Sequence, residues 1–568
     1  MMINLIDKDG HLPLVLTLLL LAYLTLMWGN GVVSLTHPDE VFYTQTAKEM
    51  LSHHNWLTPM IFDAPHFEKP ILFFWLLMAS VKLFGNTPFA ARFFPALFGM
   101  MGVLLTYGLA YRMFRDKVQA FLSAVILCTS FIYLTLSRAV LTDMVFSILV
   151  VAALTLFYMA FTATDPRQEN LCIIGGFIFS ALAVLTKGIL GAVFPLGAIV
   201  LYSIYRREGF LLRTKATLLG IILFGLIVVP WHLLMIQWYG QQFIQEYWNN
   251  VHVRRIVEAE HPTSNTWYFY LGTIVAGVMP WGVFLPQAFY SLWQQLRNRS
   301  PEKDPFVFLL MWILFIWAVM QTAQSKLASY IFPVFPAIAI VIGHYLNRVG
   351  LQQGNSSKPH GAYRLFSFMG VLLGLAAAGS IVAGEHFLTK NEMPPVYVFA
   401  ILSAACGLVL FIFARQRRFA LCLAANSLVT LIILIFLFLG HGSAEPLVSC
   451  REISQVLVRT DHSESTVLCS KFFVRGIRYY TDRKTAVIDI NGEGFFSPHP
   501  IPFLNTDQKV LDFLSTQNPT YAVVKRSQFK DLTRLTSGRY EVEQMDHIGD
   551  KYLLKIEKLN GQAGALHG

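Results

Sequence analysis

The chain has 568 residues, of which 55% are apolar and only 14% are charged. Soluble proteins usually carry about 25% charged residues, so this composition excludes a disordered chain and an ordinary soluble enzyme. The net charge is +10. In a membrane protein such an excess anchors cytoplasmic loops, so we do not interpret it as nucleic-acid binding. The composition predicts a polytopic α-helical membrane protein with a modest water-soluble part.

Apolar segments long enough to cross a membrane as helices recur along most of the chain. We count about 13 of them, by the usual requirement of roughly 20 apolar residues. They lie at 12–33, 89–111, 118–136, 140–162, 171–186, 188–205, 216–238, 267–293, 306–322, 328–346, 364–384, 395–413 and 419–440. Lys and Arg cluster in alternate short loops, such as 112–117 and 415–418. The positive-inside rule places these loops and the N-terminus in the cytoplasm, and an odd span count places the C-terminus outside.

Two segments interrupt the alternation of spans and short loops. Residues 34–88 form a long outer loop with an amphipathic helix expected over 39–52. A second helix, expected over 70–84, is too short to span comfortably and suits the membrane interface. We therefore assign residues 1–440, including this loop, to a transmembrane domain.

The remaining residues, 441–568, have a mixed polar and apolar composition. Strands are expected at 465–469, 485–490 and 520–524, with a helix at 507–514. These elements predict a small α/β domain on the outer, periplasmic face. Cys450 and Cys469 both lie in it, and the sequence leaves open whether they form a disulfide.

Several charged residues lie on the predicted outer side rather than in the cytoplasmic loops. A charge at membrane depth costs at least about 2.5–3.5 kcal/mol, so it normally has a partner or a function. The set comprises Asp39, Glu40, Glu68, Lys69, Arg138, Asp143, Lys187, Arg254, Arg255 and Lys326. Most of these residues have both a structural and a functional interpretation.

In the first outer loop, Asp39 and Glu40 stand at the start of the expected helix. Asp39 is either an N-cap or a functional carboxylate, and Glu40 suits the first turn of a helix. Glu68 precedes Lys69. Lys69 is either the ion-pair partner of Glu68 at the interface or a point charge that binds phosphate.

Arg138 and Asp143 flank the start of one predicted span. They form an ion pair at the rim, or Asp143 serves a function about one turn inside the span. His252 and Arg255 belong to an outer-loop segment rich in aromatic residues. That segment is either an anchoring aromatic belt or, because the Arg fork matches phosphate, part of an anion site.

Lys326 and Tyr330 are four residues apart, so a helix would present both on one face. They either donate to an anion together or anchor the span. Because all of these residues fall on one membrane face, the sequence predicts an outer, wet cavity lined by carboxylates and cations. Carboxylates supply base or metal functions, and cations hold a phosphate or pyrophosphate. A lipid-phosphate substrate would enter such a cavity sideways from the bilayer.

A transporter or flippase for a lipid-linked sugar is the alternative from another functional class. Transporters place their charged groups near the bilayer midplane, on broken and often repeated helices. Here the charges crowd at one face and no internal repeat is evident, so we favour an enzyme. The chain contains no Walker A, H-E-x-x-H or G-x-S-x-G motif.

Three parts of the sequence resemble the bacterial ArnT-type aminoarabinose transferases. These belong with the protein O-mannosyltransferases among the polyprenyl-phosphate-dependent, C-type glycosyltransferases. The similar stretches are His37-Pro-Asp-Glu-Val-Phe-Tyr with Phe67-Glu-Lys-Pro, His252-Val-Arg-Arg with Met279-Pro-Trp-Gly, and Ser325-Lys-Leu-Ala-Ser-Tyr-Ile-Phe-Pro. The resemblance implies the C-type glycosyltransferase fold, with 13 spans and an outer α/β domain.

The resemblance implies transfer of 4-amino-4-deoxy-L-arabinose, or a related sugar, from undecaprenyl phosphate to lipid A. Transfer would occur with inversion on the periplasmic face of the bacterial inner membrane. Another glycolipid acceptor fits the same resemblance, and a protein O-glycosyltransferase using a polyprenyl-phosphate sugar is the alternative enzyme. The expected partners are the donor, the acceptor and membrane lipids, without nucleic acid.

The resemblance also assigns roles to residues of this chain. Asp39 matches the catalytic aspartate and Asp143 the second acidic site. The donor-phosphate site comprises Lys69, Arg255 and Tyr330, with Lys326 beside them. The other expected cavity residues are Glu40, Glu68, Arg138 and His252. Glu68 is also the candidate contact for a divalent cation, although nothing in the sequence requires a cofactor.

Overall fold

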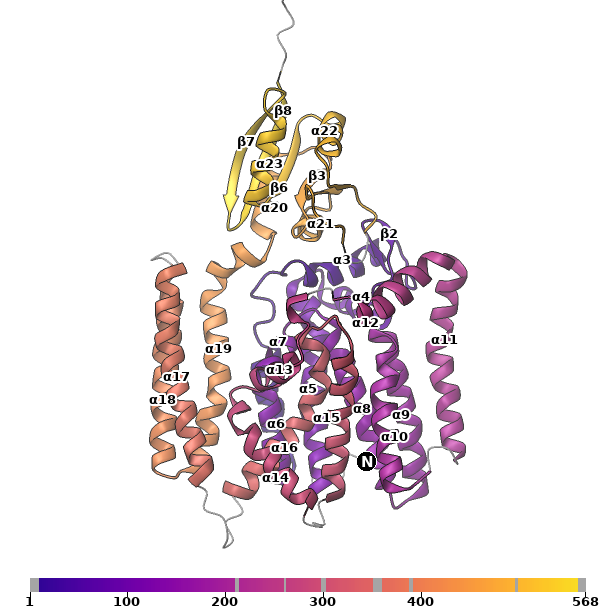
Figure 1. Ribbon diagram of the computed structural model, residues 1–568, viewed down its shortest axis with the longest axis vertical. Helices are drawn as coiled ribbons and strands as arrows, with labels where there is room; N and C mark the ends of the chain where they lie inside the picture. Colours follow the sequence, from indigo (N-terminus) through magenta and orange to yellow (C-terminus); the bar gives the residue numbers. More distant parts are fainter. Residues whose placement is uncertain are drawn as a thin grey trace, which may run out of the picture. The chain divides into compact units, whose positions relative to one another are not determined.

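The computed structural model describes residues 10–209, 214–259, 262–297, 303–350, 360–387, 392–495 and 499–559. The chain divides into two compact units (Figure 1). The first, called here the helical unit, comprises residues 1–30, 69–76 and 92–440. The second, the mixed unit, comprises residues 31–68, 77–91 and 441–568. Three of the five boundaries between them fall inside the helices α4 (Leu72–Phe84), α5 (Pro88–Phe114) and α19 (Phe419–Val448), and the other two follow Asn30 and Glu68.

The helical unit consists of α-helices joined by short loops, 3-10 turns and two π-helical stretches. Besides parts of α4, α5 and α19, its elements in chain order are α2 (Leu12–Ala22), η1 (Tyr23–Met27), α6 (Lys117–Cys128), α7 (Phe131–Ser137), α8 (Thr142–Phe161), α9 (Pro166–Lys187), α10 (Leu190–Arg206), α11 (Lys215–Phe243), η3 (Ile244–Val253), α12 (Arg254–Val257), η4 (Pro262–Ser264), α13 (Phe269–Gly277), η5 (Trp281–Phe284), α14 (Leu285–Arg297), α15 (Lys303–Thr322), η6 (Ala328–Val334), α16 (Phe335–Gly350), α17 (His360–Phe387) and α18 (Pro394–Arg415).

Nine helices in the described part of the chain are long and apolar enough to cross a membrane. Two bent pairs, α6 with α7 and α13 with η5 and α14, raise that number to as many as 11. The two other predicted spans contain the shorter apolar helices at 12–27 and 190–206. Each predicted span therefore contains a helix, and the expected polytopic helical fold is confirmed. The count of 13 crossings stays a prediction.

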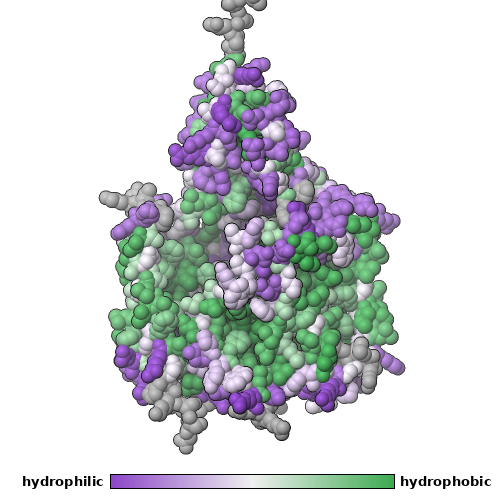
Figure 2. Space-filling model, in the orientation of Figure 1, coloured by the Kyte–Doolittle hydropathy of each residue, from purple (hydrophilic) through white to green (hydrophobic). Residues whose placement is uncertain are grey.

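The helices of this unit differ in how much apolar surface they bury. Helices α8, α9, α10 and α15 pack side by side, and α8 and α16 are largely buried (Figure 1). Helices α11, α17 and α18 instead bury only 17–28% of the residues in their most apolar windows. Figure 2 shows a broad hydrophobic band over these helices, with hydrophilic residues gathered at the helix ends. Such a band is the surface that lipid tails cover in a multi-pass membrane protein.

The mixed unit combines the first predicted outer loop with the C-terminal residues. The described first-loop elements are α3 (Asp39–Ser52), β1 (Met60–Ile61) and β2 (Ala64–Pro65), followed by part of α4. The C-terminal elements are α20 (Arg451–Thr460), β3 (Val467–Ser470), α21 (Val474–Thr481), β4 (Thr485–Ile488), β5 (Phe503–Leu504), α22 (Asp507–Thr516), β6 (Thr520–Val524), α23 (Arg526–Thr536), β7 (Tyr540–Ile548) and β8 (Lys551–Lys558). The expected helices of the first loop and the expected C-terminal strands and helix are present.

Six of these strands form one sheet in the order β5-β4-β3-β6-β8-β7. The first four strands are parallel, and β8 and β7 add to them in antiparallel fashion. Because side chains alternate across a sheet, every second residue of the strands faces the same way. On one face, Leu468, Ile488, Val524 and Leu554 form a core with α22 and α23. Cys450 and Cys469 are both buried free thiols in this unit, so the structure contains no disulfide between them.

Candidate functional site

A buried ion pair joins α8 and α9 in the helical unit. Lys187 is the last residue of α9, and its Nζ lies 2.6 Å from Oδ1 of Asp143, the second residue of α8. Only 10% of the Lys187 side chain and 8% of the Asp143 side chain are exposed. With so little water around it, each charge depends on the other for compensation. Lys187 is therefore the ion-pair partner of the buried Asp143 carboxylate.

Tyr330, in η6, connects this pair to Arg255. Lys187 Nζ lies 4.7 Å from the centre of the Tyr330 ring, a cation–π distance. Arg255 Nη1 donates a hydrogen bond of 3.2 Å to the Tyr330 hydroxyl oxygen. The backbone N–H of Ser325 also donates to the Arg255 carbonyl oxygen, at 3.1 Å. The segment before η6 is thereby attached to α12, which carries Arg255.

The side-chain hydroxyl of Ser325 makes no hydrogen bond within the described part of the chain. Its Oγ is buried and has no hydrogen-bond partner in the described part of the chain. Buried hydroxyls are normally bonded, so an orphaned one beside cationic side chains suits a site that completes its hydrogen bonds with a polar ligand. Sequence reasoning missed Ser325 because a Ser at a span end carries no signal of its own.

His252 brings Lys69 into the same cluster. Its Nδ1 bonds to the Tyr247 carbonyl oxygen at 2.8 Å, which orients the ring. The charges of Lys69 and Arg255 both act on this imidazole, so both cations lie within electrostatic reach of it. Lys69 itself is only 6% exposed. Arg255 therefore contacts Tyr330, and both Arg255 and Lys69 lie within electrostatic reach of His252, while the binding of a donor phosphate by these residues stays a prediction.

A glycine makes the approach of His252 possible. Gly188 ends α9 with a φ of +98°, a conformation that L side chains rarely adopt. A Cβ at this position would lie 2.5 Å from Nε2 of His252, which is closer than atoms can approach. Lys187 therefore places its cation at the end of α9. Gly188, which follows it, leaves room for the His252 imidazole. Sequence analysis noted Lys187 as an outer charge but assigned it no role.

Three local expectations about this cluster are wrong. Arg138 is not an ion-pair partner of Asp143. Its Nη1 donates to the carbonyl oxygens of Thr25, within η1, and of Trp28, which directly follows η1, at 3.0 Å each. The segment with His252 is not a loop but helix η3, because after the kink at Gly240 no Gly or Pro interrupts the helix.

Lys326 and Tyr330 do not share an α-helical face. Tyr330 lies in the 3-10 helix η6, and Lys326 precedes that helix. Pro333 lacks the N–H that an α-helical hydrogen bond would require there, so the α-helix begins only at Phe335. Lys326 Nζ instead donates to Oδ1 of Asn265 at 2.7 Å, and Lys326 is 4% exposed.

Asp39 and Glu40 lie at the start of α3 in the mixed unit. The N-cap is Pro38, without a side-chain capping bond, so the interpretation of Asp39 as N-cap is wrong. Asp39 occupies the first turn and is exposed, whereas Glu40 is buried. Glu40 Oε2 accepts hydrogen bonds from Thr36 N at 2.9 Å and Thr36 Oγ1 at 3.0 Å. Glu40 thus stabilises the helix start that presents the Asp39 carboxylate.

Ion pairs within the mixed unit attach α3 to α21. Arg478 Nε lies 3.2 Å from Oε1 of Glu49, and its Nη2 lies 2.7 Å from Oδ2 of Asp63. Glu49 is buried and also accepts from the backbone N–H of Phe62 and Asp63 at 3.1 and 2.8 Å. This network fixes the helix that carries Asp39. The pairing joins residues more than 400 positions apart, and no local pattern indicates it.

Glu68 also belongs to the mixed unit, where Oε1 lies 4.0 Å from Nη2 of Arg475. In the described ranges, no group of three or more His, Cys, Asp or Glu side chains is arranged to hold a metal ion. A contact between Glu68 and a divalent cation stays a prediction. The mechanism proposed below uses no metal.

His499 packs beside Arg475 in the mixed unit. Because this histidine is buried, we expect the stability of the mixed unit to depend on pH. Burial, followed by the charge of Arg475, lowers the pKa of His499 from 6.5 to about 3, although Glu68 opposes the shift. The folded chain keeps this imidazole neutral while the unfolded chain protonates it near pH 6.5. Its stabilising contribution is therefore complete above pH 6.5 and declines as the pH falls toward 3.

Between pH 7.5 and pH 5, protonation of His499 in the unfolded chain lowers the free energy of unfolding by about 2 kcal/mol. Limited proteolysis of the C-terminal residues in the full chain, at both pH values, measures this loss. A His499→Gln variant is expected to show a smaller increase in cleavage at pH 5 than the unchanged chain. An equal increase in both chains would contradict the assignment.

The arrangement in the helical unit suits an anionic ligand next to a membrane. Four buried or half-buried cationic side chains accompany the Asp143 carboxylate among these residues, namely Lys69, Lys187, Arg255 and Lys326. Such a site stabilises negative charge on a phosphate, and its apolar surroundings strengthen that effect. The fold and the cluster together define a multi-pass membrane protein with a cationic site.

Comparison with known proteins is consistent with this class. The family model described as dolichyl-phosphate-mannose-protein mannosyltransferase matches residues 13–247. The undecaprenyl phosphate-alpha-4-amino-4-deoxy-L-arabinose arabinosyl transferase of Erwinia tasmaniensis is 30% identical over 408 residues, 68% of this chain and 70% of that protein. Arabinosyl transferase 2 of Proteus mirabilis is 28% identical over 364 residues, 64% of this chain. That alignment spans 63% of the Proteus protein, less than two thirds of its length.

Among solved structures, ArnT from Cupriavidus metallidurans bound to undecaprenyl phosphate matches with a TM-score of 0.76 at 20% identity. The match covers 97% of this chain and 98% of that one, so the two share a fold over nearly their full lengths. This chain belongs to the family of undecaprenyl phosphate-aminoarabinose arabinosyl transferases.

Proposed function

We propose that this chain transfers 4-amino-4-deoxy-L-arabinose, or a related sugar, from undecaprenyl phosphate to lipid A. The reaction takes place on the periplasmic face of the bacterial inner membrane, with the N-terminus in the cytoplasm. The observation that carries the proposal is the connected cluster of Asp143, Lys187, Tyr330 and Arg255 in a membrane-spanning fold. Family membership supports the choice of donor and acceptor.

The proposed reaction is a single displacement at the anomeric carbon of the sugar. The bond between that carbon and the phosphate oxygen breaks, and its electron pair leaves with undecaprenyl phosphate. An oxygen of the acceptor forms the new bond from the opposite side, which inverts the configuration. The charge that grows on the leaving phosphate is then the quantity that the site must stabilise.

The cations of the helical unit perform that stabilisation. Lys69 and Arg255 neutralise the leaving phosphate, and Arg255 offers the fork geometry that phosphate oxygens match. The Tyr330 hydroxyl accepts a hydrogen bond from Arg255 and donates a hydrogen bond to a phosphate oxygen. The Lys187 ammonium lies against the Tyr330 ring, and Asp143 holds Lys187 in that position. Lys187 and Asp143 therefore act as positioning residues.

Asp39 presents an exposed carboxylate whose role depends on the acceptor. A hydroxyl acceptor must lose a proton, and a carboxylate is a suitable base for it. A lipid A phosphate is already anionic, so it needs little help from a base and a bare carboxylate repels it. With that acceptor, we assign to Asp39 the orientation of the sugar or the binding of its ammonium group.

This assignment predicts the behaviour of an Asp39→Asn variant. The variant keeps the size and the hydrogen bonds of the side chain but loses its charge. With lipid A as acceptor we expect reduced but measurable transfer, with a larger effect on the KM for the amino-sugar donor than on kcat. Steady-state kinetics of the purified chain measure both constants. Complete loss of kcat at saturating donor would contradict this expectation, whereas retained activity excludes an essential base.

Protein O-glycosylation is the second candidate function, because the mannosyltransferase family model matches residues 13–247. Purified chain, a labelled undecaprenyl-phosphate amino sugar, lipid A and a Ser/Thr-rich peptide together separate the two candidates. We expect label in lipid A and none in the peptide. Label in the peptide alone would overturn the proposed acceptor, and label in neither would overturn transfer from this donor.

A further inference from the structure

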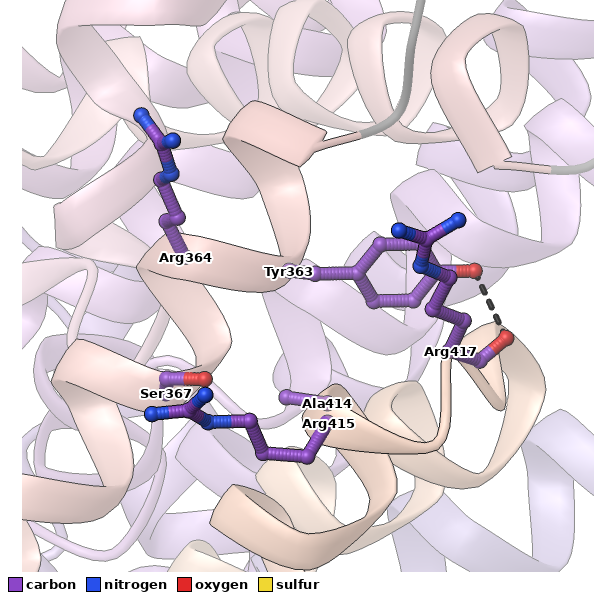
Figure 3. A pocket seen from close by; sticks show the side chains of 6 residues that line it. All are labelled: Tyr363, Arg364, Ser367, Ala414, Arg415 and Arg417. Atoms are coloured by element: carbon purple, nitrogen blue, oxygen red, sulfur yellow. Dashed lines mark hydrogen bonds between the residues drawn. The ribbon is translucent and has the colours of Figure 1, made fainter.

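A second basic site lies at the ends of α17 and α18 that the positive-inside rule assigns to the cytoplasm. Figure 3 shows a pocket lined by Tyr363, Arg364, Ser367, Ala414, Arg415 and Arg417. Its volume is about 540 Å³, within the range of roughly 300–1,000 Å³ typical of small-ligand sites. The pocket is separate in sequence from every residue of the proposed transfer site.

The local structure places three guanidinium groups around this pocket. Arg364 lies in the second turn of α17, and Arg415 is the last residue of α18. Arg417 follows in the loop with a positive φ of 56°, and its carbonyl oxygen accepts a 2.8 Å hydrogen bond from the Tyr363 hydroxyl. Figure 3 shows this bond and the Arg415 side chain extending toward Ser367, while the Arg364 side chain points away from those two residues.

Among the residues that the structure describes, acidic side chains do not compensate the charges of these three exposed arginines. In the described part of the chain, no Asp or Glu forms an ion pair with Arg364, Arg415 or Arg417. Arg415 instead lies 5.1 Å from the centre of the Phe411 ring. Three like charges around one pocket repel each other, and an anion bound between them relieves that repulsion.

The position of the pocket indicates which anion. Both α17 and α18 are membrane-spanning helices with exposed apolar side chains, so lipids surround the ends of this hairpin. Basic pockets between such helices on the cytoplasmic side bind anionic lipid head groups. We propose that this pocket binds the phosphate of an anionic phospholipid, with Arg364 and Arg415 as its main contacts.

The positive-inside rule alone would also place arginines here, but it makes a different prediction. Under that rule only the number of charges matters, so Arg418 would contribute as much as Arg415. Arg418 directly follows Arg417 yet does not line the pocket. Arg418 is therefore a matched control, because it carries the same charge and lies in the same loop but does not line the pocket.

The test uses the full chain purified in a neutral detergent. Native mass spectrometry measures binding of short-chain phosphatidylglycerol, and phosphatidylcholine of equal chain length serves as the uncharged reference. We expect the unchanged chain and Arg418→Ala to bind phosphatidylglycerol equally. The Arg364→Ala/Arg415→Ala chain is expected to bind it at least tenfold more weakly, because two of the guanidinium contacts are gone. Unchanged transfer by all three chains confirms that they fold.

Two outcomes would overturn the proposal. One is a loss of phosphatidylglycerol binding in Arg418→Ala as large as in the double variant, because that result would show a general effect of charge. The other is binding by the double variant equal to that of the unchanged chain. Glycerol phosphate and inorganic phosphate, added as competitors, distinguish the source of the anion. Displacement of the lipid by either one at micromolar concentration would assign the pocket to a soluble phosphate instead.

Discussion

A Lys69→Ala chain is expected to insert and fold but to transfer sugar roughly 10²–10³-fold more slowly, the usual effect of removing one charge-stabilising donor. Lys69 is buried and lies within electrostatic reach of His252, together with Arg255. In the proposed mechanism its ammonium group stabilises the leaving phosphate more strongly as the sugar departs. The loss should therefore appear in kcat more than in KM.

The control for this prediction is Lys82→Ala. Lys82 is an exposed cation in the last turn of α4, the helix that Lys69 precedes, and its Nζ lies 4.3 Å from the centre of the Trp56 ring. We expect Lys82→Ala to transfer sugar at the normal rate. A conservative Lys69→Arg chain keeps the charge and should retain part of the activity. Near-normal transfer by Lys69→Ala would remove Lys69 from the donor-phosphate site.

A Lys187→Ala chain is expected to lose about 3–5 kcal/mol of stability, because it leaves the buried Asp143 carboxylate without its partner. The side chains of both residues are at most 10% exposed, so water replaces the lost contact poorly. Thermal unfolding of the full chain in detergent measures the effect. Transfer should fall as well, since Lys187 supports the ring of Tyr330.

A double variant separates the structural role of this pair from its role in transfer. In Lys187→Met/Asp143→Leu, both charges are replaced by apolar groups of similar size, and this is often neutral or stabilising for a buried pair. We expect stability to return while transfer stays low. Recovery of both stability and transfer would show that the pair is structural only and would exclude it from the site.

The sequence was most informative where a pattern is local. A span of about 20 apolar residues and an abrupt change in composition at His441 depend only on neighbouring residues. Both features led to the correct fold class. The strands of the C-terminal residues, such as Thr520–Val524, were also predictable, because short runs rich in β-branched, aromatic and apolar residues are visible in the sequence.

The details that sequence reasoning missed depend on contacts between distant residues. The partner of Asp143 is Lys187, 44 positions away, rather than the nearby Arg138. The contact between Arg478 and Glu49 joins positions 429 apart. Local backbone geometry was the other difficulty. The 3-10 helix at Ala328–Val334 separates Lys326 from Tyr330, although an α-helix would have placed them together.

Mass spectrometry of lipid A tests most directly whether this chain transfers an amino sugar to lipid A. Cells that produce undecaprenyl-phosphate aminoarabinose but lack their own transferase are compared with and without this chain. The account predicts lipid A carrying one or more added aminopentose groups with the unchanged chain, and much less with Lys69→Ala produced at the same level. Lipid A of unchanged mass, in cells where the chain is present in the inner membrane, would contradict the account.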